Sequence, residues 1–147
     1  MTTTVSTTAN RSLTSSIIAG AIAGLVGGAA FGMMLALMGM LPMVAMLVGS
    51  ESAAIGFIVH MAISAFIGAV YGVVASRLPQ STGVAIGAGA VNGVIWWVLG
   101  ALILMPLMLG MSAMVLQIGG DQWMSLLGHL IFGVVTALVF LPLSKRF

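Results

Sequence analysis

Charged residues are the scarcest feature of this sequence. Only 4% of its 147 residues are charged: four are Lys or Arg and two are Asp or Glu. A soluble domain carries about a quarter charged residues, so this chain cannot cover a water-facing surface. The net charge of +2 is also too small to form the basic patch of a nucleic-acid-binding protein, and we expect no nucleic-acid partner.

Cysteine is absent altogether. Disulfide bonds, iron–sulfur clusters and thiolate zinc sites are therefore excluded for this chain. A set of nucleophile, base and acid is missing as well, because the two acidic residues, Glu51 and Asp121, both fall in predicted loops. The same placement argues against a carboxylate relay for proton-coupled transport. We expect a protein that is not an enzyme.

Apolar residues, by contrast, make up 61% of the chain. Runs of about 20 apolar residues are long enough to cross a bilayer. Four such runs predict an all-α membrane protein, a bundle of four transmembrane helices, with spans at about 17–40, 53–75, 83–105 and 123–143. Residues 1–16 are expected to form a flexible polar tail and residues 144–147 a basic tail. Pro42 and Pro106 are expected to bend or end the first and third spans.

The few charges predict the orientation of the bundle. In a four-span chain the basic residues fall on one side and the acidic residues on the other. The basic side holds Arg11, Arg77, Lys145 and Arg146, and the acidic side holds Glu51 and Asp121. By the positive-inside rule, both termini face the cytoplasm, as in a multi-pass protein of the inner membrane.

Small residues recur every fourth position along the spans, which lets membrane helices approach closely. The positions expected to pack helices together are Gly20, Gly24, Gly28, Gly32, Gly56, Ser64, Gly68, Gly72, Gly89, Gly93 and Gly133. A four-helix bundle need not use every such stripe internally. We therefore expect a surplus stripe to contact other membrane subunits or a second copy of the chain.

The two halves of the chain resemble each other. A shift of 69 residues places Gly20 on Gly89, Gly24 on Gly93, and His60 on His129. Each half is a helical hairpin with the same orientation. The pattern predicts a tandem repeat of two hairpins, related by an axis along the membrane normal.

His60 and His129 are the residues with the strongest chemical signal. Both lie about two turns inside the outer boundary of their spans, and Trp96 and Trp97 are expected at the same level. An ionisable residue at this depth is a functional candidate, because it is costly to place there. A neutral imidazole offers the acceptor nitrogen that a haem iron or a chlorophyll magnesium requires.

The spacing of small residues around each histidine extends this interpretation. A flat macrocycle needs a helix face without bulk at positions −4, +4 and +8 from its ligand. Those positions are Gly56, Ser64 and Gly68 around His60, and Ser125, Gly133 and Ala137 around His129. The pattern predicts haem b or a (bacterio)chlorophyll bound by His60, His129, Trp96 and Trp97, with the two histidines as metal ligands. They either share one ring or hold one each.

Two other interpretations stay open. In the first, the small residues only pack helices, and each histidine bonds to a carbonyl or hydroxyl group, with Ser64, Asn92 or Thr136 as partners. In the second, the methionines bind copper, because thioethers suit Cu(I). The methionines of this alternative site are Met38, Met40, Met43, Met46, Met105, Met108, Met111 and Met114.

In layout, the whole chain resembles small bacterial four-span inner-membrane proteins of uncharacterised function. The resemblance is carried by a Gly-rich first span and by His60-x3-Ser64-x3-Gly68 in the second; the second half departs from this pattern at Ala137. It implies the four-span fold and no particular activity. The histidines and the small-residue stripes described above favour a non-catalytic accessory subunit of an electron-transfer or photosynthetic membrane complex. The competing class is a small membrane transporter or copper-handling protein.

Overall fold

Residues 12–146 are described by the computed structural model, and over this range they form helices joined by turns and short loops. Four helical segments are long and apolar enough to cross a membrane. They are α1 (Leu13–Leu37), α3 (Ala53–Ala75), a continuous run from Thr82 to Met108, and α6 (Gly120–Leu143). The third segment consists of α4 (Thr82–Trp96), the π-helix η2 (Trp97–Leu104) and α5 (Met105–Met108). The prediction of an all-α fold with four long apolar helices is confirmed over the described residues, and these helices are compatible with a multi-pass membrane protein.

Helices α1 and α3 pack into the first hairpin, through glycines. A Cβ atom on Gly68 would meet the carbonyl oxygen of Gly20 and the Cα atom of Gly24. A Cβ atom on Gly24 would in turn meet the carbonyl oxygen of Ser64. The two backbones are therefore in direct contact, which only glycine permits at these positions.

Helices α4 and α6 form the second hairpin in the same way. A Cβ atom on Gly89 would meet the carbonyl oxygen of Gly133, and one on Gly93 would meet that of His129. In the first hairpin Gly24 faces Ser64, whereas its counterpart Gly93 faces His129, which corresponds to His60. The crossing point thus differs between the hairpins by about one helical turn.

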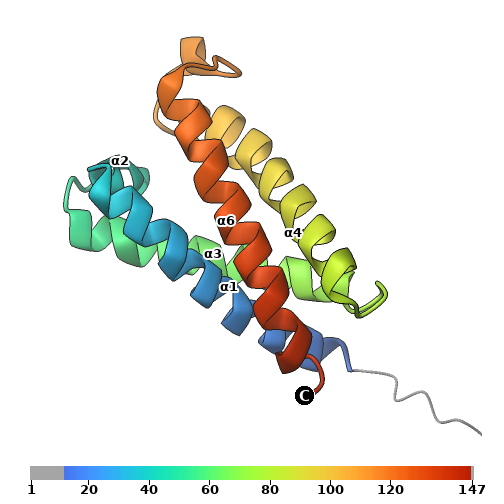
Figure 1. Cartoon of the computed structure of the whole chain (residues 1–147). Helices are drawn as coiled ribbons and strands as arrows, with labels where there is room; N and C mark the ends of the chain where they lie inside the picture. The colour runs from blue at the N-terminus through green and yellow to red at the C-terminus, as the bar shows by residue number, and fades with distance from the viewer. Residues whose placement is uncertain (1–11, 147) are drawn as a thin grey trace, which may run out of the picture.

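The two hairpins meet where α1 packs on α6. Gly27 makes room there for the side chain of Thr136 and the backbone of Phe132. Contacts between α3 and α4 are few, so the hairpins diverge from this seam toward the end that carries α2 (Leu41–Ala45) (Figure 1). The start of α1 and the end of α6 lie together at the opposite end (Figure 1).

The end of α1 differs from the expected one. The helix stops at Leu37 instead of Met40, because Gly39 adopts a φ of 67° and turns the chain. The N–H of Met40 then bonds to the carbonyl of Leu35 at 2.9 Å, which is the Schellman pattern of helix termination. Pro42 therefore does not end the first span. It lies in the first turn of α2, where a missing N–H costs nothing.

Pro106 does not end the third span either, because the helix continues to Met108. Proline lacks the N–H that would bond to the carbonyl of Leu102, four residues earlier. The N–H of Leu116 bonds to that carbonyl instead, at 2.9 Å, after the chain has turned back past η3 (Ser112–Met114). Leu116 has a φ of 57° and is the one non-glycine residue with positive φ in the described range.

Two further helix boundaries differ from the predicted ones. Helix α1 begins at Leu13, where the side chain of Ser12 accepts a hydrogen bond from the N–H of Ser15, so residues 13–16 are helical and not part of a tail. Helix α6 begins at Gly120, three residues before the predicted start, with Asp121 in its first turn. Residues 1–11 and 147 lie outside the described range, and with them the predicted tail residue Arg11.

Candidate functional site

A cavity of about 470 Å³ lies between the diverging ends of the two hairpins. It is walled by the last turns of α1, by α2, η1 (Met46–Val48) and α3, and on the other side by the α4–η2–α5 run and the first turns of α6. Its lining is apolar apart from the indole of Trp96 and four polar side chains: His60, Asp121, Ser125 and His129. A small-molecule site has this size and composition.

His60 lies on α3 and is buried. Its Nε2 is 2.9 Å from the carbonyl oxygen of Gly28 on α1. A carbonyl only accepts, so Nε2 carries the hydrogen and donates it. The imidazole fits beside α1 because Gly32 leaves space for it: a Cβ atom there would lie 3.1 Å from the ring carbon Cδ2 of His60. One ring nitrogen of His60 is thus committed to joining two helices.

His129 lies on α6 and uses its other nitrogen. Its Nδ1 is 2.8 Å from the carbonyl oxygen of Ser125, one turn earlier on the same helix, and 3.4 Å from the Ser125 hydroxyl. Nδ1 therefore donates to the carbonyl, which leaves Nε2 as an acceptor. In the described part of the chain Nε2 has no hydrogen-bond partner. This is the arrangement of a metal-binding histidine, whose second nitrogen donates to a carbonyl or carboxylate.

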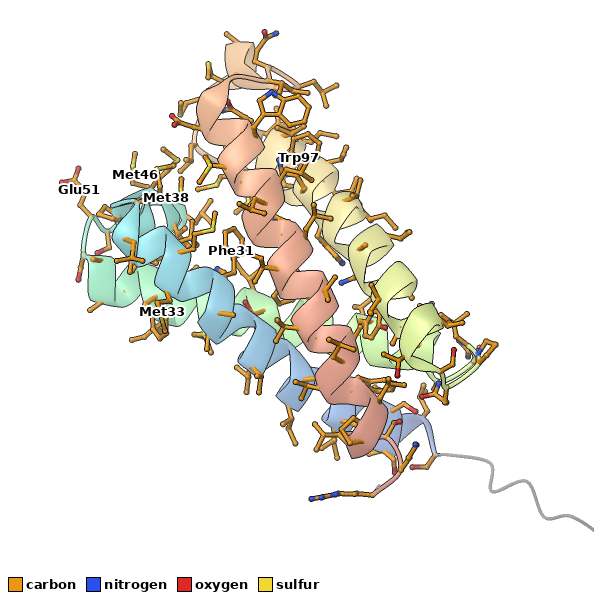
Figure 2. The ribbon with its side chains drawn as sticks, viewed as in Figure 1. Phe31, Met33, Met38, Met46, Glu51 and Trp97 are labelled. Atoms are coloured by element: carbon orange, nitrogen blue, oxygen red, sulfur yellow. The ribbon has the colours of Figure 1, made fainter. Side chains whose placement is uncertain are left out.

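Phe31 on α1, which is labelled in Figure 2, contacts both His60 and His129. Its ring centroid lies 5.3 Å from that of His60, edge to face, and 4.8 Å from that of His129. The ring enters a notch in α6 at Gly128, where a Cβ atom would collide with it. Both imidazoles therefore contact the same side chain, but they pack around a phenylalanine and not around a shared ligand. With Nε2 of His60 engaged, the two histidines are not arranged to bind opposite faces of one haem through their Nε2 atoms.

The two tryptophans point in different directions, and only one of them lines the cavity. Trp96 lines the cavity and packs edge to face against Phe66, with ring centroids 6.2 Å apart. Trp97 does not line it. Its ring, labelled in Figure 2, stacks on Trp123. Its Nε1–H donates to the carbonyl of Gln122 at 3.0 Å, which ties η2 to the start of α6. Adjacent residues point about 100° apart on a helix, so only one of the pair reaches the site.

Apart from Ser125, the small residues next to the histidines pack helices and do not line the cavity. Gly56 lies under the carbonyl of Leu41 in α2, Gly68 against α1, and Gly133 against Gly89. Ser64 lies against Gly28. Ser125 is the member of this set that lines the cavity. The space for a ligand comes from the divergence of the hairpins, which the residue spacing did not reveal.

Only some methionines of the alternative copper site line the cavity. Five of them line the cavity beside the histidines: Met38, Met40, Met43, Met105 and Met108. Met46, Met111 and Met114 are exposed and do not line it. Within residues 12–146 no three His, Asp or Glu side chains come together as a metal site. A metal here needs methionine ligands or a ligand atom from a cofactor.

The polar residues named as partners for the histidines are elsewhere. Asn92 Nδ2 and Thr136 Oγ1 are buried without a hydrogen-bond partner among the described residues. His60 uses a backbone carbonyl of another helix, which is one of the interpretations that the sequence left open.

Three features of the site were missed: Phe31, the notch at Gly128, and Asp121. Asp121, Ser125 and His129 all line the cavity and follow one another at every fourth position of α6. That spacing was a readable signal for one polar face. Nothing in the sequence singles out Phe31 or Gly128.

Comparison with known proteins returns no matching family model, no matching curated protein and no matching solved structure. The resemblance to small bacterial four-span proteins stays a prediction. The functional argument therefore depends on the geometry of the cavity.

Proposed function

We propose that the chain is a non-catalytic accessory subunit of an electron-transfer or photosynthetic membrane complex. In this proposal it holds a flat, lipid-soluble macrocycle of the haem or chlorophyll type in the cavity between its hairpins. Nε2 of His129 would hold the metal of such a ring, and Trp96, which lines the same cavity, would pack against it. The observation that carries the proposal is the hydrogen bond from Nδ1 of His129 to the Ser125 carbonyl, which leaves Nε2 as an unpartnered acceptor in an apolar cavity.

His60 has a supporting role in this proposal. It joins α3 to α1 through Gly28 and contacts Phe31, which contacts His129 in turn. The contact with Phe31 keeps the imidazole of His129 in one orientation. A ligand nitrogen that is held in place in this way raises the affinity for the bound group. His60 thus acts on the ligand through Phe31, whereas the sequence pattern had placed it on the metal.

We further infer that the protein lies in the inner membrane with both termini in the cytoplasm. The described basic residues Arg77, Lys145 and Arg146 lie at the end opposite to Glu51 and Asp121, as the positive-inside rule requires. The cavity then opens in the outer half of the bilayer. The use of Gly20 and Gly24 in one hairpin, and of Gly89 and Gly93 in the other, supports descent from a tandem repeat.

Assembly with another membrane helix is supported by α4. A Cβ atom on Gly83 or Gly87 would have no atom within 4 Å, whereas Gly89 and Gly93 on the same helix are covered by α6. This uncovered pair suits a partner subunit or a second copy. Blue-native electrophoresis of gently solubilised native membranes tests this, and copurification with mass spectrometry identifies the partner. A clean monomer that copurifies with nothing contradicts the subunit role.

The ligand is tested by the absorbance spectrum of protein purified from native membranes. We expect a Soret-type band that is lost in His129→Gln and kept in His60→Gln. Glutamine at position 60 still presents an N–H to the Gly28 carbonyl, whereas glutamine at position 129 offers no imidazole nitrogen. A colourless wild-type protein, or a band equally strong in His129→Gln, contradicts macrocycle binding through His129.

Copper handling is a second candidate, favoured by the five methionines that line the same cavity as His129. Thioether and imidazole ligands suit Cu(I). Elemental analysis of the purified protein distinguishes the two functions. Stoichiometric copper in a colourless protein, reduced by Met105→Leu and Met108→Leu but not by Met46→Leu outside the cavity, would favour copper over a macrocycle.

A further inference from the structure

We infer that the cavity selects a macrocycle without ionised side chains, such as an esterified chlorophyll-type ring, and disfavours haem with its two free propionates. This inference rests on the proposed function and names the ligand class within it. It follows from the charges that face the cavity.

Among residues 12–146, Asp121 is the one charged residue that lines the cavity. It is exposed and lies in the first turn of α6. Ser125 and His129 follow it at intervals of four, so the three side chains form one polar face along the cavity wall. Asp121 and His129 are eight residues apart, which is about 12 Å along a helix. A ring bound at His129 therefore lies in the same cavity as a carboxylate.

No described basic residue is near enough to balance an anionic ligand. Arg77 follows α3, and Lys145 and Arg146 follow α6, all at the opposite end of the bundle. The helix rise places Lys145 roughly 35 Å from Asp121. Exposed charges interact weakly beyond about 8 Å at physiological ionic strength. An anion in the cavity would thus meet a negative group and no positive one.

The two ligand classes differ in this respect. Haem b carries two propionates that ionise near neutral pH, and proteins hold buried carboxylates with paired donors or cations. In this cavity a propionate finds no cation among the described residues and shares the space with the Asp121 carboxylate. A ring whose carboxyl groups are esterified avoids both costs, and its ester chain is as apolar as the methionine-rich lining.

Two zinc porphyrins test this inference directly. Zinc protoporphyrin IX and its dimethyl ester share one ring and one metal, and they differ only in the two carboxyl groups. Zinc in such a ring takes a single axial ligand, as expected from one free imidazole. Each is titrated into the full chain in lipid nanodiscs, and binding is followed by the Soret shift and by the quenching of tryptophan fluorescence.

The measured quantity is the ratio of ester affinity to diacid affinity, compared between wild type and Asp121→Asn. Partitioning of the two porphyrins into lipid cancels in this comparison. We expect the ratio to fall by about threefold in Asp121→Asn, since Asp121 is exposed and solvent screens the like charge that is removed. Asp121→Lys is expected to lower it further.

The possible outcomes separate the two proposals. An equal ratio in wild type and both Asp121 variants overturns the selection by charge and leaves macrocycle binding intact. Failure of both porphyrins to bind wild type, or equal binding to wild type and a folded His129→Gln variant, overturns the proposed function, and the charge selection with it. A ratio that depends on Asp121 while binding depends on His129 supports both.

Discussion

The Nε2–H of His60 donates a hydrogen bond of 2.9 Å to the carbonyl oxygen of Gly28, from α3 to α1. The same α1 face carries Gly32, whose missing side chain leaves room for the imidazole, and Phe31, which packs on it. A histidine that first appears to be a metal ligand thus holds the first hairpin together next to the cavity.

This hydrogen bond predicts different effects for two substitutions. His60→Ala removes the donor and leaves a void, and we expect a loss of roughly 2 kcal/mol in the free energy of unfolding. His60→Gln keeps an N–H within reach of the carbonyl and is expected to cost less than about 1 kcal/mol. Reversible unfolding in mixed micelles, followed by circular dichroism, measures both. Equal losses would show that the hydrogen bond contributes little.

The crossing of α1 and α3 predicts a larger effect at Gly68. In Gly68→Ala the new Cβ atom meets backbone atoms of Gly20 and Gly24, which cannot rotate away. We expect a loss of about 3 kcal/mol, the upper range for overpacking. Gly87→Ala on α4, measured on the separated monomer, is the matched control, because a Cβ atom there meets open space within the chain. We expect its stability to be unchanged or slightly higher, since alanine favours the helix. A similar loss in both variants would rule out close packing as the cause.

The sequence allowed most of the fold to be predicted, because two signals act at every turn of these helices. Long apolar runs with almost no charge select the bilayer, and glycines at every fourth position select the faces that meet. The span at 53–75 agrees with α3 at both ends. The helix ends that differ from the predicted ones depend on single backbone hydrogen bonds, such as Met40 to Leu35 and Leu116 to Leu102. Composition does not encode these bonds.

The site was predicted less completely. The expected common level of His60, His129 and Trp96 is compatible with the cavity that all three line, because the rise per residue of an α-helix is constant. Trp97 was expected at the same level and does not line the cavity. Whether an imidazole nitrogen is free depends on which helix lies opposite. Packing places the Gly28 carbonyl of α1 beside Nε2 of His60, whereas Nδ1 of His129 bonds to the Ser125 carbonyl of its own helix. Two histidines with similar sequence neighbours therefore have different hydrogen-bond partners.

Phe31 and Gly128 give a prediction for this packing. In Gly128→Ala the new methyl group collides with the Phe31 ring, which must leave its place beside His129. We expect a loss of about 2 kcal/mol in unfolding free energy and weaker binding of zinc porphyrin ester. The double variant Phe31→Leu with Gly128→Ala removes the collision and is expected to be more stable than the sum of the single effects. Strict additivity would mean that the two residues are not in contact.

The hydrogen bond from Leu116 to Leu102 predicts how the loop before α6 is held. Leu116→Pro removes the N–H and cannot adopt a φ of 57°, so the loop should detach from the third span. We expect amide exchange in residues 109–119 to increase by at least tenfold, as measured by hydrogen–deuterium exchange with mass spectrometry. Leu116→Asn is the control, because asparagine tolerates positive φ and keeps the N–H. It should leave exchange unchanged, and faster exchange in both variants would mean that the leucine side chain holds the loop.

Leu104 and Met105, which are near the Leu102 carbonyl in the chain, line the cavity. Detachment that also lowers porphyrin affinity would therefore link the loop to the shape of the site.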